Sequence, residues 1–240
     1  MIPKIIHYCW FGHNPLPPLA LKCIASWKKY LPDYEIKEWN ENNFDVKMNL
    51  FVKEAYKLQQ YAFVSDYARF WILNNYGGIY FDTDVELIRP IDDIIERGAF
   101  TGMENPYRKS KGLWGINPGL GIGTEKNNPI ISMLLSKYEN IHFVNRRGAF
   151  STTIVKTCSE LMNKMPYEID QSGVAIFKNI NVFPQEFFSP KNYETGELNL
   201  TENTRSIHHY AATWVKKKNF LNRLSQRIEW LKIRYLKNEE

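Results

Sequence analysis

Two carboxylates that stand one residue apart are the part of this sequence best suited to chemistry. Asp82 and Asp84 follow an apolar run that begins after Gly77 and Gly78. Carboxylate oxygens are hard ligands that suit Mg²⁺ or Mn²⁺, and a cation held by them can bind a diphosphate and offset the charge of a phosphate leaving group. Open parallel sheets bind ligands at the carboxyl ends of their strands. The pair therefore favours chemistry on a nucleotide sugar or another phosphate compound over a structural role.

A second pair of charged residues precedes the two carboxylates. Asp66 and Arg69 lie three apart in a predicted helix, so they share one face of it. They can form a surface ion pair, which would contribute little to stability. Alternatively, Asp66 can accept hydrogen bonds from sugar hydroxyls while Arg69 contacts a phosphate or sugar oxygen. The spacing leaves both interpretations open.

Two adjacent histidines supply a third candidate. His208 and His209 fall in a predicted strand, where neighbouring side chains face opposite sides, so at most one of them would normally join a given site. That histidine could complete a metal shell begun by the carboxylates, or it could be an ordinary core or surface residue. The glycine-rich stretch at 117–123 fits neither dinucleotide nor P-loop spacing. We interpret that stretch as a turn that leads into a strand near the site.

The scaffold for these residues is predicted to be an α/β fold. A strand at 2–10, a helix at 19–30 and a strand at 34–39 form one βαβ unit, which favours a mostly parallel sheet covered by helices. Residues 104–123 are predicted to be rich in loops. The remaining predicted elements are helices at 50–59, 65–76 (with Ser65 as N-cap), 92–97, 129–138 and 151–165, and strands at 79–84, 99–102 and 180–184.

At 240 residues the chain is long enough for one substantial domain, or for a domain with small insertions. The aromatic share of 15% fits either a large aromatic core or a protein that stacks on bases and sugars. The three cysteines show no C-x-x-C spacing, so we expect neither a disulfide framework nor a zinc site. We expect instead that the protein occupies a reducing compartment. We find no signal-peptide pattern and no run near the ~20 apolar residues of a membrane span, so we expect a cytoplasmic location.

The net charge is concentrated at the C-terminal end. Residues 216–240 hold eight basic and three acidic residues, an excess of five that equals the net charge of +5 for the whole chain. A nucleic-acid binder would usually carry basic charge across its working face, so we expect no nucleic-acid partner. Apolar residues recur at helical spacing in this segment, which predicts a basic amphipathic helix beside a domain at 1–215. Such a helix can lie peripherally on an anionic membrane, or it can dock on its own domain or on a second subunit.

Taken together, these segments resemble the family 32 glycosyltransferases, whose sugar-binding region contains a DxD motif. The resemblance rests on residues 5–12, Ser26-Trp27, 34–40, 65–69 with 77–84, and again on 208–214. It implies a GT-A fold, a Rossmann-like sandwich that uses a nucleotide-sugar donor and Mn²⁺ or Mg²⁺ and retains the configuration of the anomeric carbon. Front-face attack would need no enzymic base, since the leaving phosphate can take the proton of the acceptor.

The resemblance also implies roles for single residues. Asp82 would contact ribose or sugar, and Asp84 would bind the metal, with His209 at the position of a further metal ligand in more distant toxin relatives. Those relatives carry a serine where this chain has Ala212, so a ligand role there is lost. The remaining donor contacts would be Trp10 on the base, Asp66 and Arg69 on the sugar and diphosphate, and Trp214 against the phosphates.

Three other functions fit parts of the pattern. A haloacid-dehalogenase-type phosphatase also places Asp-x-Asp after a strand, but it needs Thr or Val where Glu86 stands. A glycosidase needs two acids several ångströms apart across the bond. A non-catalytic carbohydrate-binding protein would not explain the metal pair.

By analogy we expect a UDP-hexose donor such as UDP-galactose or UDP-glucose. We expect the acceptor to be a glycan or a lipid-linked saccharide in the synthesis of a surface polysaccharide, such as capsule or lipopolysaccharide.

Overall fold

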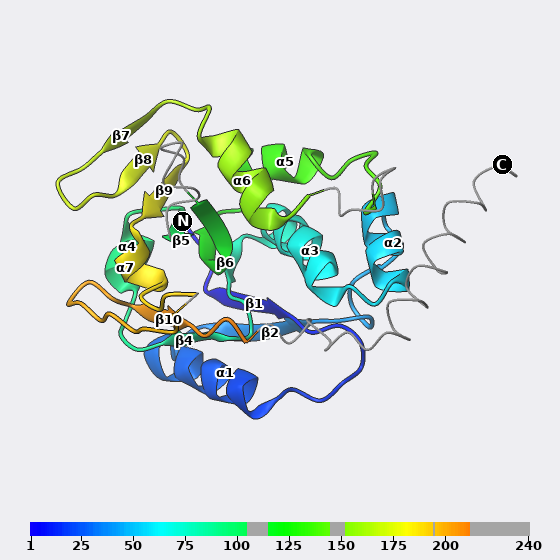
Figure 1. Cartoon of the computed structure of the whole chain (residues 1–240), viewed down its shortest axis with the longest axis horizontal. Coiled ribbons are helices and arrows are strands. Elements are labelled where there is room, and N and C mark those ends of the chain that lie inside the picture. Colours follow the sequence, from blue (N-terminus) through cyan, green and yellow to red (C-terminus); the bar gives the residue numbers. More distant parts are fainter. Residues whose placement is uncertain (105–114, 145–151, 194, 212–240) are drawn as a thin grey trace, which may run out of the picture.

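The architecture is a sandwich built on one large sheet (Figure 1). The computed structural model describes residues 1–104, 115–144, 152–193 and 195–211. The pairing of neighbours shows that all strands of the sheet except β6 and β8 run in the same direction, so the sheet is mostly parallel and the predicted fold class is confirmed. The strand order is β2 (Glu35–Trp39), β1 (Ile5–Cys9), β3 (Gly78–Tyr80), β6 (Gly115–Thr124), β5 (Phe100–Glu104), β9 (Ile180–Phe183), β8 (Ala175–Phe177) and β7 (Tyr167–Ile169).

A second, two-stranded sheet brings distant parts of the chain together. Strand β4 (Val85–Leu87) pairs antiparallel with β10 (Ser206–His208), and His208 lies opposite Val85. Because β4 follows directly on Asp84, this register places the residues after β10 beside the two carboxylates. Residues separated by more than 120 positions thus meet at one end of the large sheet.

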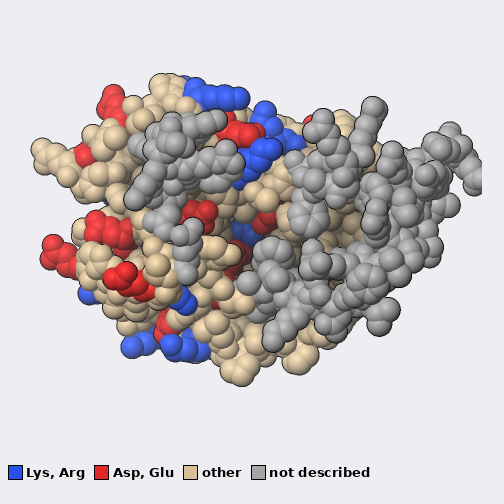
Figure 2. All heavy atoms as spheres, in the orientation of Figure 1, with Lys and Arg blue, Asp and Glu red and all other residues tan. Residues whose placement is uncertain are grey.

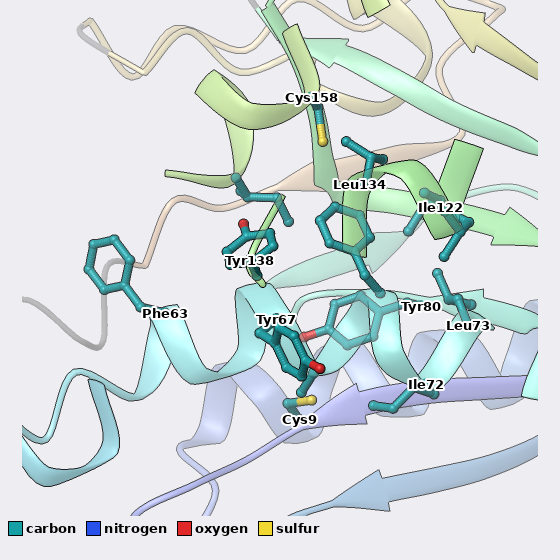
Figure 3. Packing of buried hydrophobic residues seen from close by; sticks show 14 of the residues in the cluster. Cys9, Phe63, Tyr67, Ile72, Leu73, Tyr80, Ile122, Leu134, Tyr138 and Cys158 are labelled. Atoms are coloured by element: carbon teal, nitrogen blue, oxygen red, sulfur yellow. The ribbon is translucent and has the colours of Figure 1, made fainter. Parts of the chain in front are cut away.

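Helices cover both faces of the large sheet, and alternating strand residues supply a core to each layer. Ile6 and Tyr8 of β1 pack on the side of α1, whereas Cys9 packs with Tyr67 of α3 and with Tyr80 on the other side (Figure 3). Figure 1 shows α1 on one face and α3, α5 and α6 on the other. The helices are α1 (Pro18–Tyr30), α2 (Leu50–Lys57), α3 (Tyr61–Tyr76), α4 (Asp92–Glu96), α5 (Pro129–Ser136), α6 (Ile154–Met162) and α7 (Gln185–Phe188).

Most of the predicted elements agree with these bounds, but three predictions are wrong, and one of them is the strand at 79–84, because β3 ends at Tyr80. Helix α3 begins at Tyr61, so Ser65 lies in its second turn and is not its N-cap. The Ser65 hydroxyl donates to the carbonyl of Tyr61 over 3.1 Å. The region at 104–123 is not all loop, because β6 is a strand of ten residues that are buried throughout. Its glycines serve close packing. A Cβ atom on Gly123, for example, would stand 2.3 Å from the ring of Phe100.

The predicted C-terminal helix at 216–240 and the predicted domain boundary at 215 lie outside the described residues, as do Trp214 and Ala212. Within the ranges that the structure describes, no helix combines the length and the apolar character needed to cross a membrane.

Candidate active site

A cavity of about 1140 Å³ opens at the carboxyl ends of the central strands. Trp10 after β1, Asp82 after β3 and Glu104 at the end of β5 all line it, together with Asp66 and Arg69 of α3. Acidic and basic atoms meet near the centre of the face that Figure 2 shows. Drug-sized ligands occupy pockets of roughly 300–1,000 Å³, so the cavity is large enough for a nucleotide sugar.

The two carboxylates converge because the chain turns after β3. The backbone N–H of Val85 donates to the carbonyl of Asp82 over 3.0 Å, which closes a turn, so the pair does not lie in the extended chain that the sequence predicted. Ligand atoms of Asp82, Asp84 and His208 all lie within 4.8 Å of one another. Two carboxylates and one imidazole form a donor set that suits Mn²⁺ and tolerates Mg²⁺.

Further contacts hold this cluster in place. Nε2 of His208 lies 3.1 Å from Oδ1 of Asp84, and the backbone N–H of Ala211 donates to Asp84 Oδ2 over 2.8 Å. Burial opposes the charge on Asp84, but the hydrogen bonds from His208 and Ala211 outweigh it and lower the pKa of this carboxyl. Within the described part of the chain, the buried Nδ1 of His208 has no hydrogen-bond partner. An ionised Asp84 beside an imidazole with one unused nitrogen fits a bound divalent cation.

The prediction that chose His209 as the metal ligand needs correction. Its Nε2 lies 2.8 Å from Oε2 of Glu86, and the same carboxylate oxygen accepts from Nζ of Lys22 over 2.8 Å. Adjacent residues of an extended strand point in opposite directions. Since His208 faces the carboxylates, His209 faces away and joins this separate ion pair.

Arg69 and Asp66 form a buried pair rather than the surface ion pair considered from the sequence. The Arg69 side chain is only 3% exposed, and its Nη2 lies 2.9 Å from Asp66 Oδ1 and 3.2 Å from Asp82 Oδ1. Its guanidinium also stacks over the ring of Tyr80 at 4.7 Å. Arg69 therefore links α3 to the DxD turn and presents a fixed positive charge to the cavity.

The other two carboxylates respond to burial in a different way from Asp84. Burial raises the pKa of Asp66 to about 7, although Arg69 and a hydrogen bond from the backbone of Ile154 favour its charged form. Burial likewise raises the pKa of Asp82, again against the effect of Arg69. Burial thus opposes ionisation of both groups, and Arg69, in contact with each of them, favours it.

Trp10 lines the cavity, as its predicted contact with a base requires. It is half-buried, and its Nε1 donates to the carbonyl of Asn14 over 2.6 Å, which fixes the indole against the following loop. The contacts that the sequence assigned to Trp10, Asp66, Arg69 and Asp82 with a donor remain predictions.

Sequence reasoning missed several groups of the cavity wall. Asn117 Nδ2 donates to Glu104 Oε2 over 2.8 Å, and Asn117 Oδ1 accepts from the backbone N–H of Gly119 over 2.8 Å. Tyr210 packs against His208 with ring centroids 4.2 Å apart. Glu104 and Asn117 belong to no motif, and the glycine-rich stretch around Asn117 indicates a turn. Tyr210 lies in the segment 208–214 that carries the resemblance, but the sequence assigns it no role.

Comparisons with known proteins agree with this geometry. Residues 17–101 match the family model described as "Glycosyltransferase sugar-binding region containing DXD motif". The chain is 32% identical over 126 residues to inositol phosphoceramide mannosyltransferase 3 of Schizosaccharomyces pombe, a match that covers 49% of this chain and 34% of that protein. It is 29% identical over 126 residues to a mannosyl phosphorylinositol ceramide synthase of Saccharomyces cerevisiae, which covers 49% of this chain and 32% of that one. The chain therefore spans about a third of the length of these relatives.

One solved structure similar to this chain is a glycosyltransferase involved in glycosylation of the major capsid of PBCV-1. It is 12% identical, with a TM-score of 0.49 and coverage of 94% of this chain and 100% of that one. A likeness of this size carries no argument about function. The matched DXD region and the curated relatives agree with the resemblance to the family 32 glycosyltransferases that the sequence motifs indicated.

Proposed function

We propose that this protein is a metal-dependent glycosyltransferase that moves a hexose from a nucleoside diphosphate sugar to a hydroxyl group of an acceptor, with retention at the anomeric carbon. The observation that carries the proposal is the convergence of Asp82, Asp84 and His208 beside the buried Arg69 in one cavity. A non-catalytic binding protein would not need a cation site beside a fixed guanidinium, and the cavity of about 1140 Å³ is large enough for a nucleotide sugar.

Each residue of the site has a role that follows from its chemistry. A divalent cation bound by Asp82, Asp84 and His208 would offset the charge that develops on the diphosphate. Arg69 adds a positive charge that is already in place and needs no reorganisation during the reaction. Asp66 accepts hydrogen bonds from sugar hydroxyls and orients the donor, and Trp10 stacks on its base. Catalysis then rests on positioning and on electrostatic stabilisation of the leaving group.

The identity of the substrates belongs to the same proposal. Two relatives carry names that specify mannose transfer to inositol phosphoceramides, which supports a hexose donor and makes GDP-mannose the first donor to test against UDP-glucose and UDP-galactose. For the acceptor we propose a glycan or lipid-linked saccharide. We also propose a cytoplasmic location, with the basic segment at 216–240 in peripheral contact with the inner face of the plasma membrane.

The experiment that tests this function measures nucleotide release from the three donors with and without Mn²⁺. We expect one donor to be cleaved in the presence of Mn²⁺ and Asp84→Asn to abolish that activity while the protein stays folded. Asp92→Asn is the matched control, because Asp92 is an exposed aspartate on α4 outside the cavity. Full activity of the Asp84→Asn protein would refute the assignment.

A further inference from the structure

We propose that Glu104, Tyr193 and Tyr210 form a subsite for a pyranose ring of the acceptor, on the cavity wall next to the metal cluster. This inference rests on the proposed function and names the class of acceptor that the site takes. All three residues line the cavity, and none comes from α3, from the DxD turn or from the segment after β1 with Trp10, which hold the donor contacts named under the proposed function. They come from the end of β5, from the loop after α7 and from the segment after β10.

Glu104 supplies a carboxylate that is anchored on one side only. Its Oε2 accepts a hydrogen bond from Asn117 Nδ2 over 2.8 Å, and Asn117 is itself fixed by the backbone N–H of Gly119. Within the described residues, no hydrogen bond is formed by Oε1 of Glu104. Glu104 is half-buried, and this burial raises the pKa of its carboxyl. A sugar hydroxyl can donate a hydrogen bond to Oε1, as water does to exposed carboxylates.

Tyr193 and Tyr210 supply the apolar surface that the ring of a sugar requires. Tyr193 is 70% exposed at the rim of the cavity, and its ring stands edge-on to that of Tyr210 at 5.3 Å. Tyr210 is held by its hydroxyl, 2.6 Å from the Ser189 hydroxyl. One rigid aromatic ring thus supports an exposed one. The C–H face of a pyranose can pack on such a ring while its hydroxyls reach a carboxylate.

The position of this wall fits an acceptor. In the proposed function, a cation held by Asp82, Asp84 and His208 would bind the diphosphate of the donor, and the anomeric carbon is joined to that diphosphate through a single oxygen. The acceptor hydroxyl must come within about 3–3.5 Å of that carbon, so its binding groups must adjoin the cluster. Tyr210 meets this condition, because its ring centroid lies 4.2 Å from that of His208. Glu104 and His208 line the same cavity.

The test compares two rates of the full chain with Mn²⁺ and the donor that the wild type cleaves. The first is donor hydrolysis without acceptor, and the second is transfer to methyl α-D-mannopyranoside or methyl β-D-galactopyranoside. We expect Glu104→Gln to lower transfer about tenfold or more, as loss of a hydrogen bond to a charged group does, and to leave hydrolysis within about twofold. Tyr193→Ala should raise the KM for the acceptor severalfold, whereas Tyr193→Phe keeps the ring and should behave like the wild type.

Binding of the same methyl glycosides, followed by saturation-transfer NMR with Mg²⁺ and without donor turnover, separates this inference from the proposed function. If the wild type cleaves no donor, the proposed function fails, and a glycoside signal that Glu104→Gln and Tyr193→Ala remove still supports a sugar subsite. The inference is overturned if both variants bind and transfer as the wild type does. It is also overturned if hydrolysis and transfer fall together, because the wall would then act on the donor.

Discussion

One methyl group on Gly119 would test how tightly the site is built. Gly119 lies in β6, and a Cβ atom there would stand 2.3 Å from Asp82 Oδ2, 3.0 Å from Asn117 Oδ1 and 3.2 Å from Arg69 Nη1. The backbone at this position is not left-handed, so Gly119→Ala introduces crowding without backbone strain. The nearest atom belongs to a residue of the proposed cation site, and the perturbation therefore acts on Asp82 directly.

The size of the effect follows from the distances. Ordinary van der Waals contact begins at 3.4 Å, so the carboxylate must move by the difference from 2.3 Å, about 1.1 Å. Such a shift disturbs the contacts of Asp82 with Arg69 Nη2 and with the Tyr80 hydroxyl, both at 3.2 Å. A displacement of about 1 Å in a catalytic group costs roughly 10²-fold in rate, which corresponds to about 2.7 kcal/mol on the barrier.

The assay is Mn²⁺-dependent nucleotide release from the donor, normalised to the folded fraction from urea unfolding. Gly123→Ala is the matched control, since its Cβ atom would also stand 2.3 Å from a neighbour, but from the ring of Phe100 in the core. We expect the control to lose stability and to keep its rate per folded molecule, while Gly119→Ala loses about 10²-fold. A folded Gly119→Ala protein with the rate and Mn²⁺ affinity of the wild type would refute the reasoning.

Three further predictions concern metal binding, stability at low pH and membrane binding by residues 216–240. His208→Ala should weaken Mn²⁺ binding about tenfold or more in calorimetry, and His209→Ala should not; the reverse result would restore the sequence-based choice. Burial lowers the pKa of His7 to about 4 from 6.5, so the unfolded chain binds the extra proton between these values, and roughly 3 kcal/mol of stability is lost as the pH falls from 6.5 to 4. Urea unfolding should show that loss in the wild type and a smaller one in His7→Asn. In liposome flotation with anionic vesicles, a chain ending at residue 215 should bind less than the full chain; equal binding would exclude a membrane role for 216–240.

The local signals in the sequence predicted the parts of the fold that depend on neighbours in the chain. The apolar spacing of the helix at 19–30 and the glycine at the end of the helix that carries Asp66 and Arg69 are examples. Gly77 ends that helix with φ +67°, and its N–H donates to the Leu73 carbonyl over 2.9 Å. The i, i+3 spacing correctly put Asp66 and Arg69 on one face. Burial of that pair could not be predicted, because it depends on the strands packed beneath α3.

The glycines of β6 show why the glycine content of residues 104–123 leads to a wrong prediction of secondary structure. Glycine commonly marks a turn because it tolerates unusual backbone angles. Gly119 and Gly123 are required for a different reason, because a side chain would collide with Asp82 at the first position and with Phe100 at the second. Phe100 comes from β5 and Asp82 from the turn after β3, 23 and 37 positions away in the chain. A single sequence contains no record of such an approach, so its glycines predict a loop where the structure has the fully buried strand β6.

The choice between His208 and His209 makes the same point about chemistry. Alternation along a strand predicts that one of two adjacent histidines faces a site, but which one does so depends on the register of the strand. Here the pairing of His208 with Val85 settles the register, and a slip by one residue would have presented His209 instead. Glu86 reinforces the observed register, since it holds His209 on the far side of β4. The ion pair that looks unrelated to the site is therefore one of the contacts that decide which histidine belongs to it.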